Sequence, residues 1–249
     1  MDLKLLQELG DWYTRQARVF PALLVVFPIA LIIVVWFPGH YQGLGLATGA
    51  LSWLLLTALV SQFVRDAGKA REGSLFEKWG GTPTTLMLSH SYTSLNSITL
   101  ADCHSRLRQL RPNLDLPESG EDETKDWSKS NQVYESCSDY LREATRDKER
   151  FNLLFDELVS YGFRRNLWSL KPYGATLASL GLLGCAFRVA SPMFPKNWNL
   201  PEAVSLQTIF GTLICLALLL TWLISVTPNW VKTAAFRYAR QLVLSCEKL

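Results

Sequence analysis

The chain of 249 residues carries a formal net charge of +3, so its bulk charge gives no argument for a nucleic-acid partner. Apolar residues make up 49% of it and gather in runs long enough to cross a bilayer, which excludes an ordinary soluble globular protein. The four runs cover residues 20–37, 44–64, 173–190 and 206–227. We therefore expect an all-α membrane protein, with four transmembrane helices and a helical cytoplasmic domain inserted between spans two and three.

The N-terminal segment, residues 1–19, is predicted to be an amphipathic helix with Leu5, Leu9 and Trp12 on one side. Two interpretations stay open: the helix lies in the membrane interface, or it packs on the cytoplasmic domain. The first apolar run starts late and no A-x-A site follows it, so we expect the first span to be retained.

Residues 20–65 are predicted to form the first transmembrane hairpin, spans one and two. Gly45 and Gly49 form a G-x-x-x-G pair, a pattern that lets helices approach closely, here most simply within the hairpin. The chain turns basic directly after span two, at Arg65, Lys69 and Arg71.

Lysine and arginine gather on one side of the four runs. Besides the residues after span two, they are Arg164, Arg165, Lys171, Lys232, Arg237 and Arg240. The two opposite turns hold only Lys196, with Arg188 at the end of span three. The positive-inside rule therefore predicts a multi-pass membrane protein with both termini and the central region in the cytoplasm.

The central region, residues 66–171, is predicted to be mostly helical. Residues 77–100 are rich in Gly, Thr and Ser and are interpreted as a structured loop with short helical pieces. Helices are expected over 102–110 and 131–146. Between them, the acidic run 116–129 is interpreted as a solvated linker.

The stretch 151–190 organises the rest of the chain, because an amphipathic helix is predicted to run without interruption into span three. Arg164 and Arg165 form a basic collar at this joint. They suit bidentate binding of a phosphorylated ligand, or contact with lipid headgroups at the base of the span.

Residues 172–228 are predicted to form the second transmembrane hairpin, with small residues of span three providing a close-packing surface. Span four carries Thr208, Thr212 and Cys215 at helical spacing. This mild polar stripe has two interpretations. It lines a pore, or its hydroxyls bond to the backbone of their own helix. Residues 229–249 are interpreted as an amphipathic cytoplasmic helix attracted to anionic lipid.

Signals for catalysis or metal binding are weak. The spacing of His90, Cys103, His104 and Cys137 matches no common metal site, and no G-x-S-x-G, H-E-x-x-H or P-loop motif is present. The five cysteines have no C-x-x-C spacing, which fits free thiols in a reducing compartment. We expect no catalytic residue, no metal and no cofactor.

The most unusual polar stretch is Gly80-Gly81-Thr82 followed by Pro83. Paired glycines and a hydroxyl suit the binding of a phosphate through backbone N–H groups. The alternative is a tight turn followed by a helix, with Thr82 as N-cap and Pro83 as first helical residue.

Two motifs, EKWGGTPTTLML and TRDKERFNLLFDELVSYGFRRNLWSLKPYG, lie within residues 77–174. They resemble a family of largely uncharacterised bacterial four-span membrane proteins. Here His90 and Ser91 follow the first motif without an additional basic residue, which argues against an anion at this stretch. The overall plan looks like the membrane effectors of anti-phage systems, in which a nucleotidyltransferase makes a nucleotide or oligonucleotide signal. In one such system an oligodeoxyadenylate restrains a tetrameric channel.

Spans that hold almost no ionisable residue disfavour an ion-coupled carrier. We expect a homo-oligomeric channel or pore gated through its cytoplasmic domain, with membrane lipid and a nucleotide-type signal as partners. The alternative is a non-conducting anchor that recruits a soluble partner. A membrane-embedded enzyme acting on lipid comes last, since no catalytic constellation supports it.

Overall fold

The computed structural model describes residues 12–37, 44–92, 94–190 and 205–249, with only the backbone described for 44–48. Every element in these residues is helical and none is a strand, so the predicted all-α class is confirmed. Among the described residues, three helices are long and apolar enough to cross a membrane: Trp12–Trp36, Lys171–Ala190 and Leu206–Ser225. A fourth span over 44–64 stays a prediction.

The chain forms two compact units. The first consists of Met1–Arg71 and Gly162–Pro228, and the second of Glu72–Tyr161 and Asn229–Leu249. Three helices have residues in both units: α4 (Leu44–Trp79), α9 (Asn152–Ser169) and, by its first residue alone, α12 (Pro228–Leu244). Most of the segment 1–19 lies outside the described residues, and so do the turns 38–43 and 191–204.

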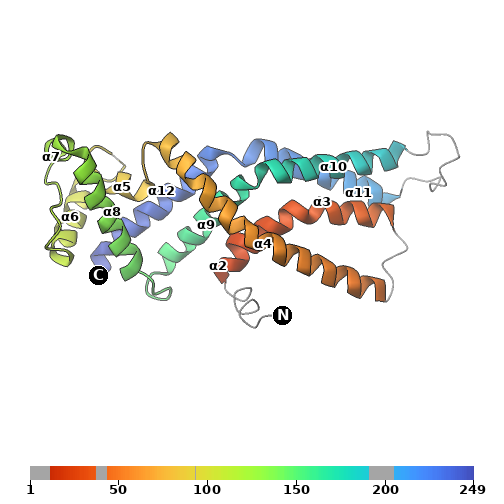
Figure 1. Cartoon of the computed structure of the whole chain (residues 1–249), viewed down its shortest axis with the longest axis horizontal. Coiled ribbons are helices and arrows are strands. Elements are labelled where there is room, and N and C mark those ends of the chain that lie inside the picture. Colours follow the sequence, from red (N-terminus) through yellow and green to blue (C-terminus); the bar gives the residue numbers. More distant parts are fainter. Residues whose placement is uncertain (1–11, 38–43, 93, 191–204) are drawn as a thin grey trace. The chain divides into compact units, whose positions relative to one another are not determined.

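In the first unit, one helix begins as α2 (Trp12–Thr14), passes through a π-helical turn η1 (Arg15–Val19) and continues as α3 (Phe20–Trp36). It packs side by side with α10 (Lys171–Ala190) and α11 (Leu206–Leu220), which ends in a second π-helical turn η5 (Thr221–Ser225) (Figure 1). The predicted close packing of small residues occurs at Gly181, where an added Cβ would lie 2.9 Å from Cys215 Sγ.

In the part of α4 that belongs to the first unit, apolar side chains point outward. Leu54, Leu59 and Phe63 are 62 to 70% exposed, whereas Thr57 and Ser61 are buried and bond to their own helix backbone. Gly49 has nothing within 4 Å of an added Cβ, so the expected close packing around it does not occur among the residues that the structure describes.

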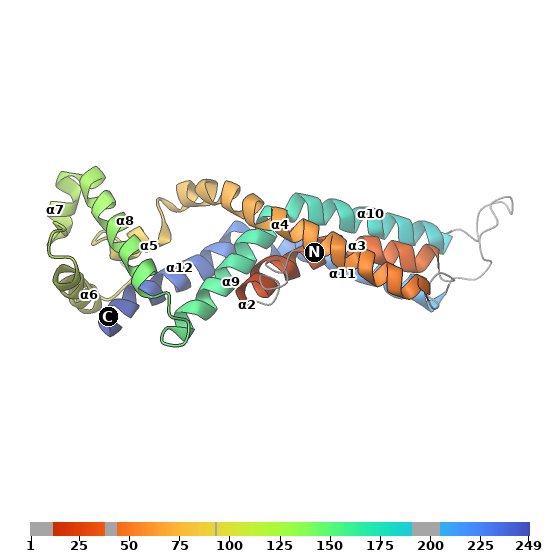
Figure 2. The ribbon, with the colours of Figure 1, turned by 60° about the horizontal axis from the view of Figure 1, so that its bottom comes forward.

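The second unit is a small helical domain with its own apolar core. Its elements between α4 and α9 are α5 (Pro83–Leu88), α6 (Ser97–Leu110), α7 (Gly120–Lys125) and α8 (Trp127–Ala144), which are labelled in Figure 2. Its C-terminal elements are α12 (Pro228–Leu244) and the 3-10 turn η6 (Ser245–Lys248). Residues of α6, α8, α9 and α12 meet in one buried cluster that includes Leu107, Tyr134, Leu141, Leu154 and Leu242.

One interpretation of a polar segment is wrong, and the predicted attraction of the C-terminal helix to anionic lipid stays a prediction. The acidic run 116–129 is not a solvated linker, because it forms α7 and the start of α8 and buries Glu123 completely. The C-terminal helix is amphipathic as predicted, but its apolar residues Val231, Ala235 and Leu242 are buried against protein. Its apolar face is therefore not free to enter a lipid surface.

The stretch 151–190 is two helices and not one. Helix α9 ends at Ser169 and α10 begins at Lys171. Pro172 has no N–H to offer the carbonyl of Trp168, which breaks the helical ladder at Leu170. The Ser169 hydroxyl donates to the Asn166 carbonyl at 2.7 Å and helps satisfy the end of α9.

Candidate functional site

A groove with a volume of about 670 Å³ lies along α7 in the second unit. Its charged residues include Lys125 and Lys129, which pair with Asp122 and Asp115 at 2.7 Å. The hydrogen bond from Lys129 lowers the pKa of Asp115. Because both pairs are exposed and balanced, the groove favours neither an anion nor a cation.

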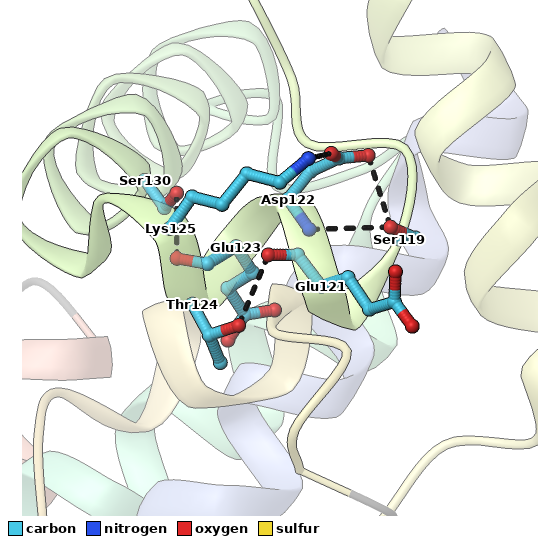
Figure 3. Close-up of polar contacts among 7 residues, drawn as sticks. All are labelled: Ser119, Glu121, Asp122, Glu123, Thr124, Lys125 and Ser130. Atoms are coloured by element: carbon cyan, nitrogen blue, oxygen red, sulfur yellow. Dashed lines mark hydrogen bonds and ion pairs between the residues drawn. The ribbon is translucent and has the colours of Figure 1, made fainter.

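The first turn of α7 is closed by its own side chains. Ser119 is the N-cap: its hydroxyl accepts from Asp122 N at 3.2 Å and donates to Asp122 Oδ2 at 2.9 Å (Figure 3). Hydrogen bonds from Lys125 and then from Ser119 lower the pKa of the Asp122 carboxyl. This local network holds α7 in place above a buried neighbour, Glu123.

Glu123 is fully buried and joins three segments of the second unit. Its carboxylate accepts from the Ser89 hydroxyl at 2.5 Å, the His90 N–H at 2.7 Å and the Tyr134 hydroxyl at 3.2 Å. Burial, and then the charge of Glu123, raise the pKa of Tyr134, so the phenol stays a donor. Three donors compensate a charge that would otherwise be costly to bury.

His104 contacts Leu88, which directly precedes Ser89 and His90, and is 1% exposed. Its Nε2–H donates to the Leu88 carbonyl at 2.8 Å, while the buried Nδ1 has no hydrogen-bond partner among the described residues. Burial lowers the pKa of His104 to about 4, so the imidazole is neutral. The described residues contain no group of three His, Cys, Asp or Glu that could hold a metal ion.

We predict that His104 makes stability depend on pH. Its pKa is 6.5 in the unfolded chain and about 4 in the folded one. Between these values the unfolded chain takes up a proton that the folded chain does not, so stability falls as pH falls, by about 3 kcal/mol in full. In His104→Gln, which keeps a donor for Leu88, this component of the pH dependence is expected to vanish in denaturant titrations. An identical pH dependence in both proteins would contradict the assignment.

The Gly80–Thr82 stretch forms the turn and not the phosphate cradle. Gly80 has φ +87°, and the N–H groups of Gly80 and Gly81 donate to Glu77 O and Phe76 O at 3.3 and 2.9 Å. This is a Schellman ending of α4, and it uses both amides that a phosphate would need. Thr82 is the extended N-cap residue of α5, and Pro83 follows as its first residue.

The basic collar is turned into the protein at Arg165. This residue is 9% exposed and its guanidinium donates to Asn166 Oδ1 at 3.3 Å, while Arg164 is half-buried and also has interaction partners. Asn166 in turn donates from Nδ2 to the Ala17 carbonyl at 2.7 Å. Ala17 lies in the π-helical turn, whose irregular ladder is where a carbonyl is free to accept such a bond.

Two glycines let other helices reach this network, which we call the Asn166 joint (Asn166, Arg165, Ala17 and Gly68). An added Cβ at Gly68 of α4 would overlap Asn166 Oδ1. At Gly162 of α9 it would lie 2.8 Å from the Tyr13 hydroxyl and 3.2 Å from Ala17 Cβ. Three helices of the first unit therefore meet around one buried amide.

The second π-helical turn, η5, has a similar contact with α10. Lys171 donates from Nζ to the carbonyls of Leu223 and Val226 at 3.2 and 2.9 Å, and so caps the end of that helix. Trp222 is buried against Gly174, where an added Cβ would overlap the indole ring. Lys171 is thus a structural cap in the first unit.

The Thr208–Thr212–Cys215 stripe faces other helices of the same chain. Thr208 and Cys215 are 2% and 0% exposed, and Cys215 packs with Val35 of α3 and Cys185 of α10. Thr212 donates to its own helix, at the Thr208 carbonyl and 2.8 Å. Within one chain, this stripe is part of a packed helix interface.

The predicted site residues belong to different units. Arg164 and Arg165 belong to the first unit, and Gly80, Gly81 and Thr82 to the second. Asn166 and Glu123 were missed, although Asn166 is 1% exposed and Glu123 fully buried. The signal for Asn166 was a polar residue on the inner side of an otherwise apolar helix.

No protein-family model, curated protein or solved structure matches this chain. The resemblance of its two motifs to bacterial four-span proteins therefore stays a prediction.

Proposed function

We propose that the protein is a gated channel or pore of the bacterial inner membrane, formed by several copies of this chain and acting in anti-phage defence. Its second unit receives a nucleotide-type signal or a partner protein, and its first unit conducts ions. Four spans, with both termini in the cytoplasm, are part of this proposal.

One observation carries the proposal: a single helix contributes to the interior of both units. Leu154 of α9 is buried in the core of the second unit, and Asn166 of the same helix is buried in the first. Because a helix is stiff over three or four turns, a change in the core around Leu154 is coupled to the Asn166 joint. Such a coupling suits a protein in which a soluble signal changes a membrane bundle.

The outward apolar face of α4 supports its role as a membrane span. Its Leu54, Leu59 and Phe63 side chains are more than half exposed. Their exposure is favourable in lipid, whereas it costs free energy in water. Arg188, unlike the outward side chains of α4, is buried: it is 8% exposed, and its guanidinium lies 6.0 Å from the Trp36 ring centroid. A snorkelling side chain would extend to solvent, and Arg188 does not. A buried cation among spans is typical of functional positions.

A second candidate is a non-conducting anchor that recruits a soluble partner. The packed Thr208–Cys215 stripe favours it, because the most polar face among the apolar helices lies against protein and lines no pore within one chain. In the channel proposal the conducting path therefore forms between chains.

Ion flux from proteoliposomes tests the proposal. Vesicles that carry the purified chain are expected to release ions faster than empty vesicles, and adenine nucleotides or oligodeoxyadenylates are expected to change that rate. Arg188→Gln is expected to change which ions pass, since it removes a fixed positive charge. Electrically silent vesicles under every added nucleotide, with a stable complex between the chain and a soluble protein, would replace the channel with the anchor.

A further inference from the structure

A small cationic pocket lies in the second unit, where α8 ends and α9 begins. Its volume is about 170 Å³, and its lining includes the cations Arg142, Arg146 and Lys148. The floor is formed by Leu154, Phe155, Leu158 and Tyr238. None of the described residues that line it is acidic. We propose that this pocket binds a phosphate group carried by a ligand with an apolar or aromatic portion.

Two of these cations, Arg142 and Arg146, are held by exposed ion pairs that an anion can replace. Arg142 and Arg146 each pair with a carboxylate one turn earlier, Asp139 and Glu143, at 2.7 Å, and these four side chains are 47 to 76% exposed. Ion pairs this exposed are weak, so a phosphate with three acceptor oxygens can compete for the guanidiniums. The larger groove along α7 differs, because carboxylates line it beside the cations.

The floor accounts for the apolar portion of the ligand. Leu154 is 7% exposed and belongs to the core, so this side of the pocket is fixed. Lys148 Nζ lies 4.8 Å from the Phe155 ring centroid, which places one cation directly over the aromatic floor. The volume is below that of pockets for drug-sized molecules, so it accommodates a phosphate and only the adjoining part of its carrier.

A phosphate monoester of this kind comes from a soluble nucleotide or from a lipid headgroup. Leu154, which the proposed function couples to the Asn166 joint through α9, lies in this pocket. Binding is nevertheless independent of conduction. If the protein binds the probe but conducts no ions, only the channel proposal is overturned. If it conducts ions but does not bind the probe, only the pocket proposal is overturned.

The test uses the full chain in nanodiscs of phosphatidylcholine, with AMP as the soluble probe and adenosine as its phosphate-free counterpart. We expect AMP to bind in titration calorimetry and adenosine not to bind. The double variant Arg146→Gln/Lys148→Gln removes two exposed cations, and we expect it to weaken AMP binding about tenfold or more. Arg106→Gln is the matched control: Arg106 is half-buried, lies outside the pocket and bonds Gln109, and its replacement is expected to leave binding unchanged.

A second arm adds phosphatidic acid to the nanodiscs and counts the lipids retained by the protein in native mass spectrometry. Retention by the wild type that the double variant loses, without AMP binding, supports the pocket with a lipid as the source. AMP binding that the double variant loses supports it with a nucleotide. Absence of both, or equal binding by the double variant and the wild type, overturns the proposal.

Discussion

Gly68→Ala is expected to lower the apparent free energy of unfolding by about 3 kcal/mol, although alanine is the better helix former. The new Cβ would overlap Asn166 Oδ1, so the Asn166 side chain has to move. That movement breaks its 2.7 Å hydrogen bond to the Ala17 carbonyl and its contact with the Arg165 guanidinium, in a place where Asn166 is 1% exposed. A denaturant titration of the chain in detergent micelles measures the effect.

Gly73→Ala is the matched control for this substitution. Gly73 lies in the same helix, and an added Cβ there has nothing within 4 Å. Its replacement is expected to stabilise the protein by about 0.5–1 kcal/mol through helix propensity alone. If the channel proposal holds, Gly68→Ala also changes the ion flux and Gly73→Ala does not. Two variants of equal stability would show that the Asn166 joint contributes nothing to the first unit.

Local sequence patterns were sufficient for the elements of this fold. Apolar run length predicted four spans, and three of them are helices long and apolar enough to cross a membrane. The 3.6-residue period placed the helix that became α8 within four residues of its observed start. The capping chemistry of Thr82-Pro83 correctly favoured a turn. These features depend on residues close together in the chain.

Features that depend on distant partners were missed. Charge density predicted solvation for the run that contains Glu123, because the Ser89, His90 and Tyr134 donors that compensate its burial lie 11 to 34 residues away. The Arg164–Arg165 collar favoured a site for lipid headgroups, with a phosphorylated ligand as the alternative. Which of the two guanidiniums turned inward was decided by Asn166 and by the missing side chain of Gly68.

The second large effect is expected at Glu123. Glu123→Ala is predicted to destabilise the second unit by about 4 kcal/mol, because it leaves two buried donors and one part-buried donor without their acceptor. The hydroxyls of Ser89 and Tyr134 can rotate toward other acceptors, but the His90 N–H is fixed by the backbone. Glu123→Gln, which keeps the volume and one acceptor oxygen, is expected to have about half of this effect.

Hydrogen exchange of the full chain measures this effect within the second unit. In Glu123→Ala, the amides of residues 89–92 and of α7 and α8 are expected to lose protection, whereas the spans of the first unit keep theirs, because Glu123 lies in the other compact unit. Glu121→Ala is the matched control: it removes an exposed carboxylate from the same first turn of α7 and is expected to cost less than about 1 kcal/mol. Equal protection in the two variants would mean that the unit is held by its apolar core alone. Loss of protection at His90 in Glu123→Ala only would instead make the buried carboxylate the contact that fixes α7 against the turn after α5.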